Sequence, residues 1–232
     1  MKVLFIFDDQ KESTFYLYDL KDGKNQLLRF SPEILIGEKT LGQLFVEHPI
    51  EKFMAYFSVA FEITVEKYLV MKKSEGLAAV KESGLDNAGF FQVENPTSFT
   101  ALQNVRHYDS GTLFLTMTEV AAYISWQIDD DGTFGVFTRQ EDVIRLMKKK
   151  LLKPRLSTIT KNIGNVNSHT QTNLGIKDML KLGQGYLAKG DDRMAKTTLP
   201  AAGTYQLAGD FPYRITAIDW QNNPIQLHPE LR

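Results

Sequence analysis

The sequence contains no cysteine, and this absence excludes several kinds of chemistry at once. Disulfide bridges, thiolate metal sites and cysteine nucleophiles are all ruled out. The compartment is not fixed by it, because exported proteins can also lack cysteine. Strong charge of one sign is missing too: the formal net charge is -1 at pH 7, so no global field selects nucleic acid or an anionic membrane.

Long hydrophobic runs are also lacking. Residues 3–7 are too few for the core of a signal peptide and lead directly into Asp8. Residues 53–65 are interrupted by Ser58 and Glu62 and fall short of the roughly 20 residues that a membrane span needs. We therefore expect no span and no export signal in this chain, which leaves open that it is the soluble part of a longer protein.

The apolar and polar residues that are present predict alternating strands and helices. Length and a hydrophobic content of 43% allow one sizeable core or two small ones. The alternation predicts one α/β domain over residues 1–232, layered, with a central mixed β-sheet flanked by helices. Strands are expected at residues 3–7, 14–20, 26–30, 63–71, 90–93 and 213–220, and helices after Pro49, at 75–83 and at 176–187.

Two further helices carry a start signal. Thr116 is followed three residues later by Glu119, and Thr138 by Glu141, which is the spacing of a capping box. Pro154 is expected to end the second of these helices.

Several motifs have a plain structural interpretation. Residues 183–188 match the letters of a dinucleotide-binding loop but lie late in a helical pattern, where no strand precedes them. Residues 129–131 are three aspartates, which we interpret as a solvated turn, although they could hold a divalent ion loosely. The basic cluster at 145–155 indicates a solvated helix end and no nucleic-acid site. The histidines show no metal-ligand spacing: His48, His107, His169 and His228.

One longer stretch is more specific. Residues 115–127 read LTMTEVAAYISWQ, and residues 131–140 read DGTFGVFTRQ. Together they resemble the second half of the LytR-CpsA-Psr domain, whose pattern is Leu-x-Gly-x-x-Ala-Leu-x-Tyr-x-Arg-x-Arg followed by Asp-x-x-Arg-x-x-Arg-Gln. Weaker matches at residues 30–32, 64–84, 172–180 and 199–203 follow in the family's order.

The resemblance implies a function in the cell envelope. Family members are anchored outside Gram-positive cells and transfer glycopolymers from polyprenyl pyrophosphate carriers to the cell wall. The lipid lies in an apolar tunnel, while arginines, acidic residues and a divalent ion hold the pyrophosphate. By resemblance we expect a lipid-linked glycopolymer or polyprenyl phosphate as ligand, with Mg²⁺ as the ion. Contact with a membrane surface is expected only through a segment outside this chain.

This sequence departs from the family pattern at the arginines. Ser125 and Gln127 occupy the two positions after the tyrosine, Val136 replaces the first arginine of the last motif, and Glu33 stands where another is expected. A charge-assisted hydrogen bond contributes roughly 1.5–3 kcal/mol, so losing several removes most of the phosphate affinity. The family reaction is therefore not expected to be retained.

The candidate ligand contacts are the polar residues that remain at or near the family's positions, and no catalytic residue is assigned. For Arg139, an ordinary ion pair with Asp131 or Glu141 is an alternative explanation. For Tyr123, the alternative is core packing, with its hydroxyl on a backbone carbonyl. The candidates are Arg139, Gln140, Lys11, Arg106 and Tyr123.

Large apolar side chains could line a lipid tunnel or fill an ordinary core: Phe53, Phe57, Phe61, Val70 and Phe91. Three hypotheses stay open. The chain is a divergent family member that binds a lipid-linked or phosphorylated polymer with weak or no activity; a non-catalytic scaffold of the cell envelope; or an unrelated cytoplasmic α/β protein. Full phosphotransferase activity is the alternative that the family itself suggests.

Overall fold

The computed structural model describes residues 1–21, 24–84, 88–102, 105–151, 170–189, 194–209 and 213–231. The chain forms two compact units, Met1–Met71 with Lys161–Arg232 (unit 1) and Lys72–Thr160 (unit 2). Each is described by itself. Whether both belong to a single domain over residues 1–232 stays a prediction.

Unit 1 is built on a six-stranded sheet with the order β11-β6-β1-β2-β3-β12. β1 pairs antiparallel with β2, β2 with β3 and β11 with β6, whereas β12 pairs parallel with β3, so the sheet is mixed, as the sequence predicts. The strands of this sheet are β1 (Lys2–Asp8), β2 (Thr14–Lys21), β3 (Lys24–Phe30), β6 (Lys67–Lys72), β11 (Thr170–Thr172) and β12 (Ala195–Leu199).

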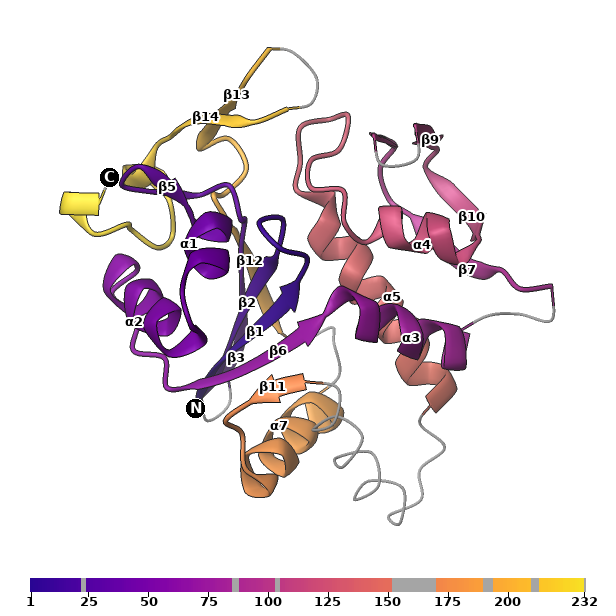
Figure 1. The fold of residues 1–232 in the computed structure, drawn as a ribbon, viewed down its shortest axis with the longest axis horizontal. Helices are drawn as coiled ribbons and strands as arrows, with labels where there is room; N and C mark the ends of the chain where they lie inside the picture. Colours follow the sequence, from indigo (N-terminus) through magenta and orange to yellow (C-terminus); the bar gives the residue numbers. More distant parts are fainter. Residues whose placement is uncertain are drawn as a thin grey trace. The chain divides into compact units, whose positions relative to one another are not determined.

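Helices and short strands complete unit 1. Figure 1 shows α1 and α2 together on one side of the sheet and α7 beside β11. The hydrophobic core lies between this sheet and the first two helices, and it also takes in Trp220 and Leu227. These elements are β4 (Leu35–Ile36), β5 (Lys39–Thr40), α1 (Leu41–Glu47), α2 (Ile50–Ala60), α7 (Ile176–Lys189), β13 (Tyr205–Leu207), β14 (Ile215–Ile218), and two 3-10 turns, Trp220–Asn222 and Pro229–Leu231.

Unit 2 packs three helices with two small two-stranded antiparallel sheets. β10 pairs with β7 and β9 with β8. The helix α3 contacts α4 and α5, and α5 contacts β7. The elements are α3 (Lys73–Gly84), β7 (Phe91–Asn95), β8 (Phe99–Ala101), β9 (Arg106–Tyr108), β10 (Gly111–Leu115), α4 (Met117–Tyr123) and α5 (Gly135–Leu151).

The capping signals in the sequence give one correct helix start and one wrong one. Thr116 and Glu119 form both reciprocal hydrogen bonds of a capping box at the start of α4. The second prediction is wrong: α5 begins at Gly135, so Thr138 lies inside the helix. An unused signal was present at Thr40 and Gln43, which form a capping box for α1.

Other expectations differ in length or lie outside the described residues. The predicted strands at residues 63–71 and 213–220 are shorter, because β6 begins at Lys67 and β14 ends at Ile218. The letters of the dinucleotide motif lie within α7, as the helical pattern around them indicates. The tip of the first hairpin at 22–23, Pro154 and His169 all lie outside the described residues.

Candidate functional site

Arg139 lies at the centre of unit 2 and has no exposed surface. Its Nε donates to the carbonyl of Tyr123 at 2.7 Å, Nη1 donates to Asp129 Oδ1 at 2.5 Å, and Nη2 donates to the carbonyl of Trp126. The guanidinium carbon also lies 4.1 Å from the centroid of the Phe99 ring. Every nitrogen of the side chain therefore holds the protein's own groups and leaves no open face for a ligand.

Gln140 supports the same loop from the next position of α5. It is 5% exposed, and its Nε2 donates to the carbonyl of Ile124 at 2.6 Å. Residues 139 and 140 thus bind the backbone carbonyls of residue 123, the last of α4, and of residues 124 and 126, which follow it. Their geometry is that of a clamp between two helices of unit 2.

Tyr123 is fully buried among aromatic rings. Its ring centroid lies 6.0 Å from that of Phe99 and 6.4 Å from that of Tyr108. The expected hydrogen bond to a backbone carbonyl is not formed, since the hydroxyl has no partner among the described residues. Burial raises the pKa of this hydroxyl, although the charge of Arg139 acts against the rise.

Asp129 corrects two sequence expectations. It is not part of a solvated turn, because its side chain is fully buried, and it replaces Asp131 and Glu141 as the ion-pair partner of Arg139. Burial raises its pKa to about 6, with the Arg139 guanidinium opposing that shift. A Cβ on Gly135 would lie 1.8 Å from Asp129 Oδ2, so the start of α5 needs glycine to pass this carboxylate.

Stability should depend on pH through Asp129. A folded-state pKa raised from 3.8 to about 6 makes the folded chain bind the proton more tightly than the unfolded chain. The stability that this group contributes is then complete below its unfolded pKa and is lost as pH rises through the folded pKa. We expect wild type to gain stability relative to Asp129→Asn as pH falls from about 7 to about 4, measured by urea denaturation. The opposite slope would show that the guanidinium outweighs burial.

Arg106 is the remaining candidate in unit 2, and it is partly exposed. It forms an ion pair with Glu119, the capping residue of α4, and lies 5.0 Å from the centroid of the Tyr108 ring. Glu119 also accepts from the backbone N–H of Thr116 at 2.7 Å. The charge of Arg106 is therefore balanced at a helix start.

Lys11 belongs to unit 1, in the exposed loop between β1 and β2. The loop is tied internally, because the N–H of Asp9 donates to Ser13 Oγ at 3.0 Å. A Cβ on Gly42 would lie 2.0 Å from the Lys11 carbonyl oxygen, so the loop rests directly on the first turn of α1. The structure thus brings Tyr123, Arg139 and Gln140 together within unit 2, and it places Lys11 in unit 1.

A second ion pair, between Glu33 and Arg214, lies in unit 1. Arg214 Nη1 donates to Glu33 Oε1 at 2.5 Å, and the backbone N–H of Ile215 donates to Glu33 Oε2 at 3.0 Å. The arginine side chain is 55% exposed and the glutamate 11%. Sequence reasoning missed Arg214, because no local motif connects it with a glutamate 181 positions earlier.

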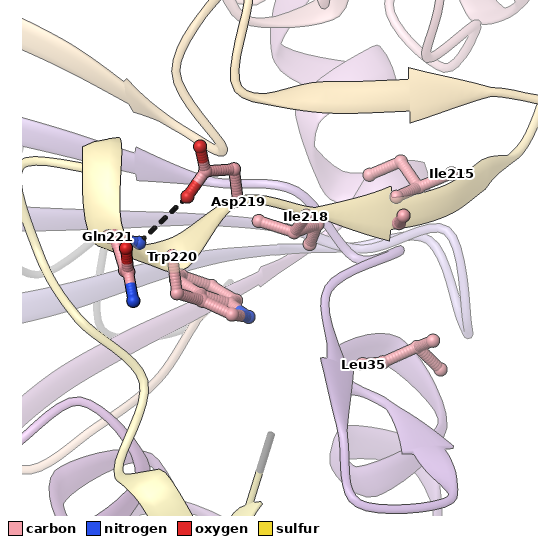
Figure 2. Close-up of a pocket in the computed structure, with 7 residues that line it drawn as sticks. Leu35, Ile215, Ile218, Asp219, Trp220 and Gln221 are labelled. Atoms are coloured by element: carbon pink, nitrogen blue, oxygen red, sulfur yellow. Dashed lines mark hydrogen bonds between the residues drawn. The ribbon is translucent and has the colours of Figure 1, made fainter.

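An apolar pocket of about 470 Å³ is lined in part by Ile215, whose N–H donates to Glu33 of this ion pair. Figure 2 shows Leu35 on one side, with Ile215 and Ile218 of β14 on the other side and Trp220 beside them. At one end of the pocket, Asp219 Oδ1 accepts from the N–H of Gln221 at 3.0 Å. Hydrogen bonds, first of all the one from the Asn222 side chain, lower the pKa of Asp219. The residues that line it are Leu35, Ile215, Ala217, Ile218, Asp219, Trp220 and Gln221.

The apolar residues that by sequence could line a lipid tunnel or fill an ordinary core do not line this pocket. Phe53, Phe57, Phe61 and Val70 are part of the hydrophobic core of unit 1, and Phe91 is buried in unit 2. Their rings pack closely; Phe57 lies 4.9 Å from both Phe30 and Phe61, between ring centroids. In the described structure these side chains fill a core.

The acidic residues near Lys11 do not fit the divalent ion that the resemblance implies. Both oxygens of Glu33 face hydrogen-bond donors. Within the described parts of the chain, no group of three His, Asp or Glu side chains is arranged to hold a metal ion. We therefore assign no metal ligands.

Comparison with known proteins decides the family. The family model described as LytR_cpsA_psr matches residues 51–223, well over half of the chain. The chain belongs to the LytR-CpsA-Psr family. Members of this family are proteins of cell-wall glycopolymer biology, associated with the cell envelope. No curated protein matches the sequence.

Solved structures show the same fold at low sequence identity. Bacillus subtilis TagV has a TM-score of 0.62 and 16% identity, covering 93% of this chain and 89% of TagV. Protein gbs0355 from Streptococcus agalactiae has a TM-score of 0.65 and 17% identity, with 93% and 81% covered. A LytR-Csp2A-Psr enzyme from Actinomyces oris has a TM-score of 0.63 and 12% identity, with 100% and 86% covered. At these identities the likeness establishes the α/β fold alone.

None of the described helices combines the length and the apolar character needed to cross a bilayer.

Proposed function

We propose that this LytR-CpsA-Psr protein binds a lipid-linked glycopolymer precursor through unit 1 without transferring it. The carrier's apolar chain would enter the pocket of Figure 2, and its phosphate would meet Arg214. The observation that carries this proposal is the position of Ile215, which lines the pocket and directly follows an exposed arginine. By family membership the proposal places the protein at the outer face of a Gram-positive cell.

The chemistry of both parts suits such an amphiphile. Pockets of roughly 300–1,000 Å³ hold small ligands, so this one takes a short apolar segment next to the head group. A guanidinium presents a planar fork that bonds two phosphate oxygens and stays charged at every physiological pH. Lys11, exposed beside Glu12, adds a second cation in unit 1.

Loss of catalysis is inferred from the positions that match the family's arginines. Ser125, Gln127 and Val136 are buried and uncharged, and Arg139, which matches an arginine of the family pattern, is fully occupied by Asp129 and backbone carbonyls. Phosphoryl transfer depends on fixed positive groups that stabilise the charge developing on the phosphate oxygens. In unit 2 these residues no longer supply such groups.

Native mass spectrometry with geranylgeranyl diphosphate tests binding. Wild type should form a one-to-one complex, and Arg214→Ala should weaken it by about 10-fold or more, since a charge-assisted hydrogen bond is lost. Arg145→Ala is the matched control, because the described ion pair of Arg145 is a local one with Asp142 on the surface of α5, so this variant should bind as wild type does.

Two outcomes would overturn the proposal. A wild-type chain that stays unbound at saturating ligand would remove the binding function. Release of prenyl monophosphate from a carrier that holds the glycan through a diphosphate, with transfer of the phosphorylated glycan to an acceptor hydroxyl, would show that catalysis is retained.

A further inference from the structure

We propose that Glu33 is an internal anion that occupies the phosphate position of the Arg214 site and must be displaced before a ligand binds. This inference rests on the proposed function and concerns the regulation of the same site. Its basis is that the two donors a phosphate would use, a guanidinium and a backbone N–H beside the pocket, both point at one carboxylate of the chain itself.

The geometry of the contact is that of a bound anion. Oε1 of Glu33 accepts from Arg214 Nη1 at 2.5 Å, and Oε2 accepts from the N–H of Ile215 at 3.0 Å. One carboxylate therefore spans a side-chain donor and a main-chain donor, as two oxygens of a phosphate would. Because Ile215 also lines the pocket, this anion position lies at the edge of the apolar cavity.

Glu33 is aimed at these donors from a buried turn. Its own N–H donates to Ser31 Oγ at 3.2 Å, and Ser31 is fully buried after β3. The N–H of Ser31 in turn donates to the carbonyl of Leu199, at the end of β12, at 2.9 Å. The carboxylate is thus held by the central sheet, whereas more than half of the Arg214 side chain is open to solvent. The Glu33 carboxylate is therefore preorganised for this ion pair.

The carboxylate of Glu12 adds to the competition between Glu33 and a phosphate for Arg214. Glu12 lies close enough that Arg214 and Glu33 both act on it: burial raises its pKa most, Arg214 lowers it and Glu33 raises it. An arriving phosphate therefore meets an arginine that two glutamates already compensate. The apparent affinity is reduced in proportion to the small fraction of molecules in which Arg214 is released.

Removing the internal charge should therefore tighten binding. Glu33→Gln keeps the size of the side chain and an oxygen that accepts from Ile215, but it gives up the charge that competes with phosphate. We expect geranylgeranyl diphosphate to bind about 10-fold more tightly to this variant by isothermal titration calorimetry, while geranylgeraniol, which has the same chain and no phosphate, binds equally to both. Glu62→Gln removes one exposed charge elsewhere in unit 1 and controls for net charge.

A measurement on the wild-type chain makes the test independent of how the variant folds. The amide resonance of Ile215 should move further with the diphosphate than with geranylgeraniol, because both ligands occupy the pocket that Ile215 lines but only the diphosphate replaces Glu33 as its acceptor.

The possible outcomes distinguish failure of this inference from failure of the proposed binding function. If neither wild type nor Glu33→Gln binds the diphosphate, the proposed function fails and the inference with it. If wild type binds but Glu33→Gln binds no more tightly, or the Ile215 amide moves no further with the diphosphate than with the alcohol, the internal anion is refuted and the binding function stands.

Discussion

Arg139→Ala is expected to lower the free energy of unfolding by about 3–5 kcal/mol, because it leaves Asp129 as a buried carboxylate without its cation. The same change frees the carbonyls of Tyr123 and Trp126, which lose their donors inside unit 2. Urea denaturation followed by tryptophan fluorescence measures the loss, and Trp126 lies within the affected loop. Binding of geranylgeranyl diphosphate to the folded fraction should be unchanged.

Two further variants make this result specific. Arg145→Ala, on the exposed side of α5, should change stability by less than about 0.5 kcal/mol. Combining Arg139→Met with Asp129→Leu should recover much of the loss, because no unpaired charge is then buried. If Arg139→Ala were nearly as stable as wild type but lost the ligand, Arg139 would be the ligand contact that the sequence predicts.

Phe57→Ala is expected to cost about 3–5 kcal/mol, the usual loss when a large aromatic side chain is removed from a packed core. Phe57 is fully buried in α2, and its ring lies against Phe30 of β3 and the neighbouring Phe61. A side chain that lined an open tunnel would have fewer contacts to lose. Thermal and urea unfolding of the purified variant measure the effect.

Phe114→Ala is the control for this second experiment. Phe114 lies in β10 and is 56% exposed, so its removal should change stability by less than about 0.5 kcal/mol. If Phe57→Ala lowered the free energy of unfolding only slightly but abolished prenyl binding, Phe57 would be shown to line a lipid tunnel.

The central elements of the fold were predictable because their signals are local. Alternation of apolar and polar residues predicted β1, β2 and β3 within a residue or two at each end, and helical spacing predicted α2 and α7. The start of α5 was not predictable in the same way. Thr138 and Glu141 have the letters of a capping box, but the turn before α5 already positions Gly135, and the helix begins there.

In the candidate site, what the sequence could indicate and what only the structure revealed are easy to separate. Residues 115–140 were sufficient to indicate the family, and their substitutions indicated which arginines are missing. The role of the arginine that remains was not contained in them, because Asp129, Asp131 and Glu141 are all close to Arg139 in sequence. Only burial distinguishes these acids: Asp129 has no exposed surface, whereas Asp131 is exposed and Glu141 half-buried.

The amino-acid sequence alone determined the α/β class, the likeness to the LytR-CpsA-Psr family and the loss of charge at its arginine positions. Tertiary structure decided which charges neutralise one another, namely Arg139 with Asp129 and Arg214 with Glu33. The physical reason is range: strand and helix patterns arise between residues a few positions apart, whereas an ion pair depends on where the folded chain brings two side chains and how much water it leaves around them.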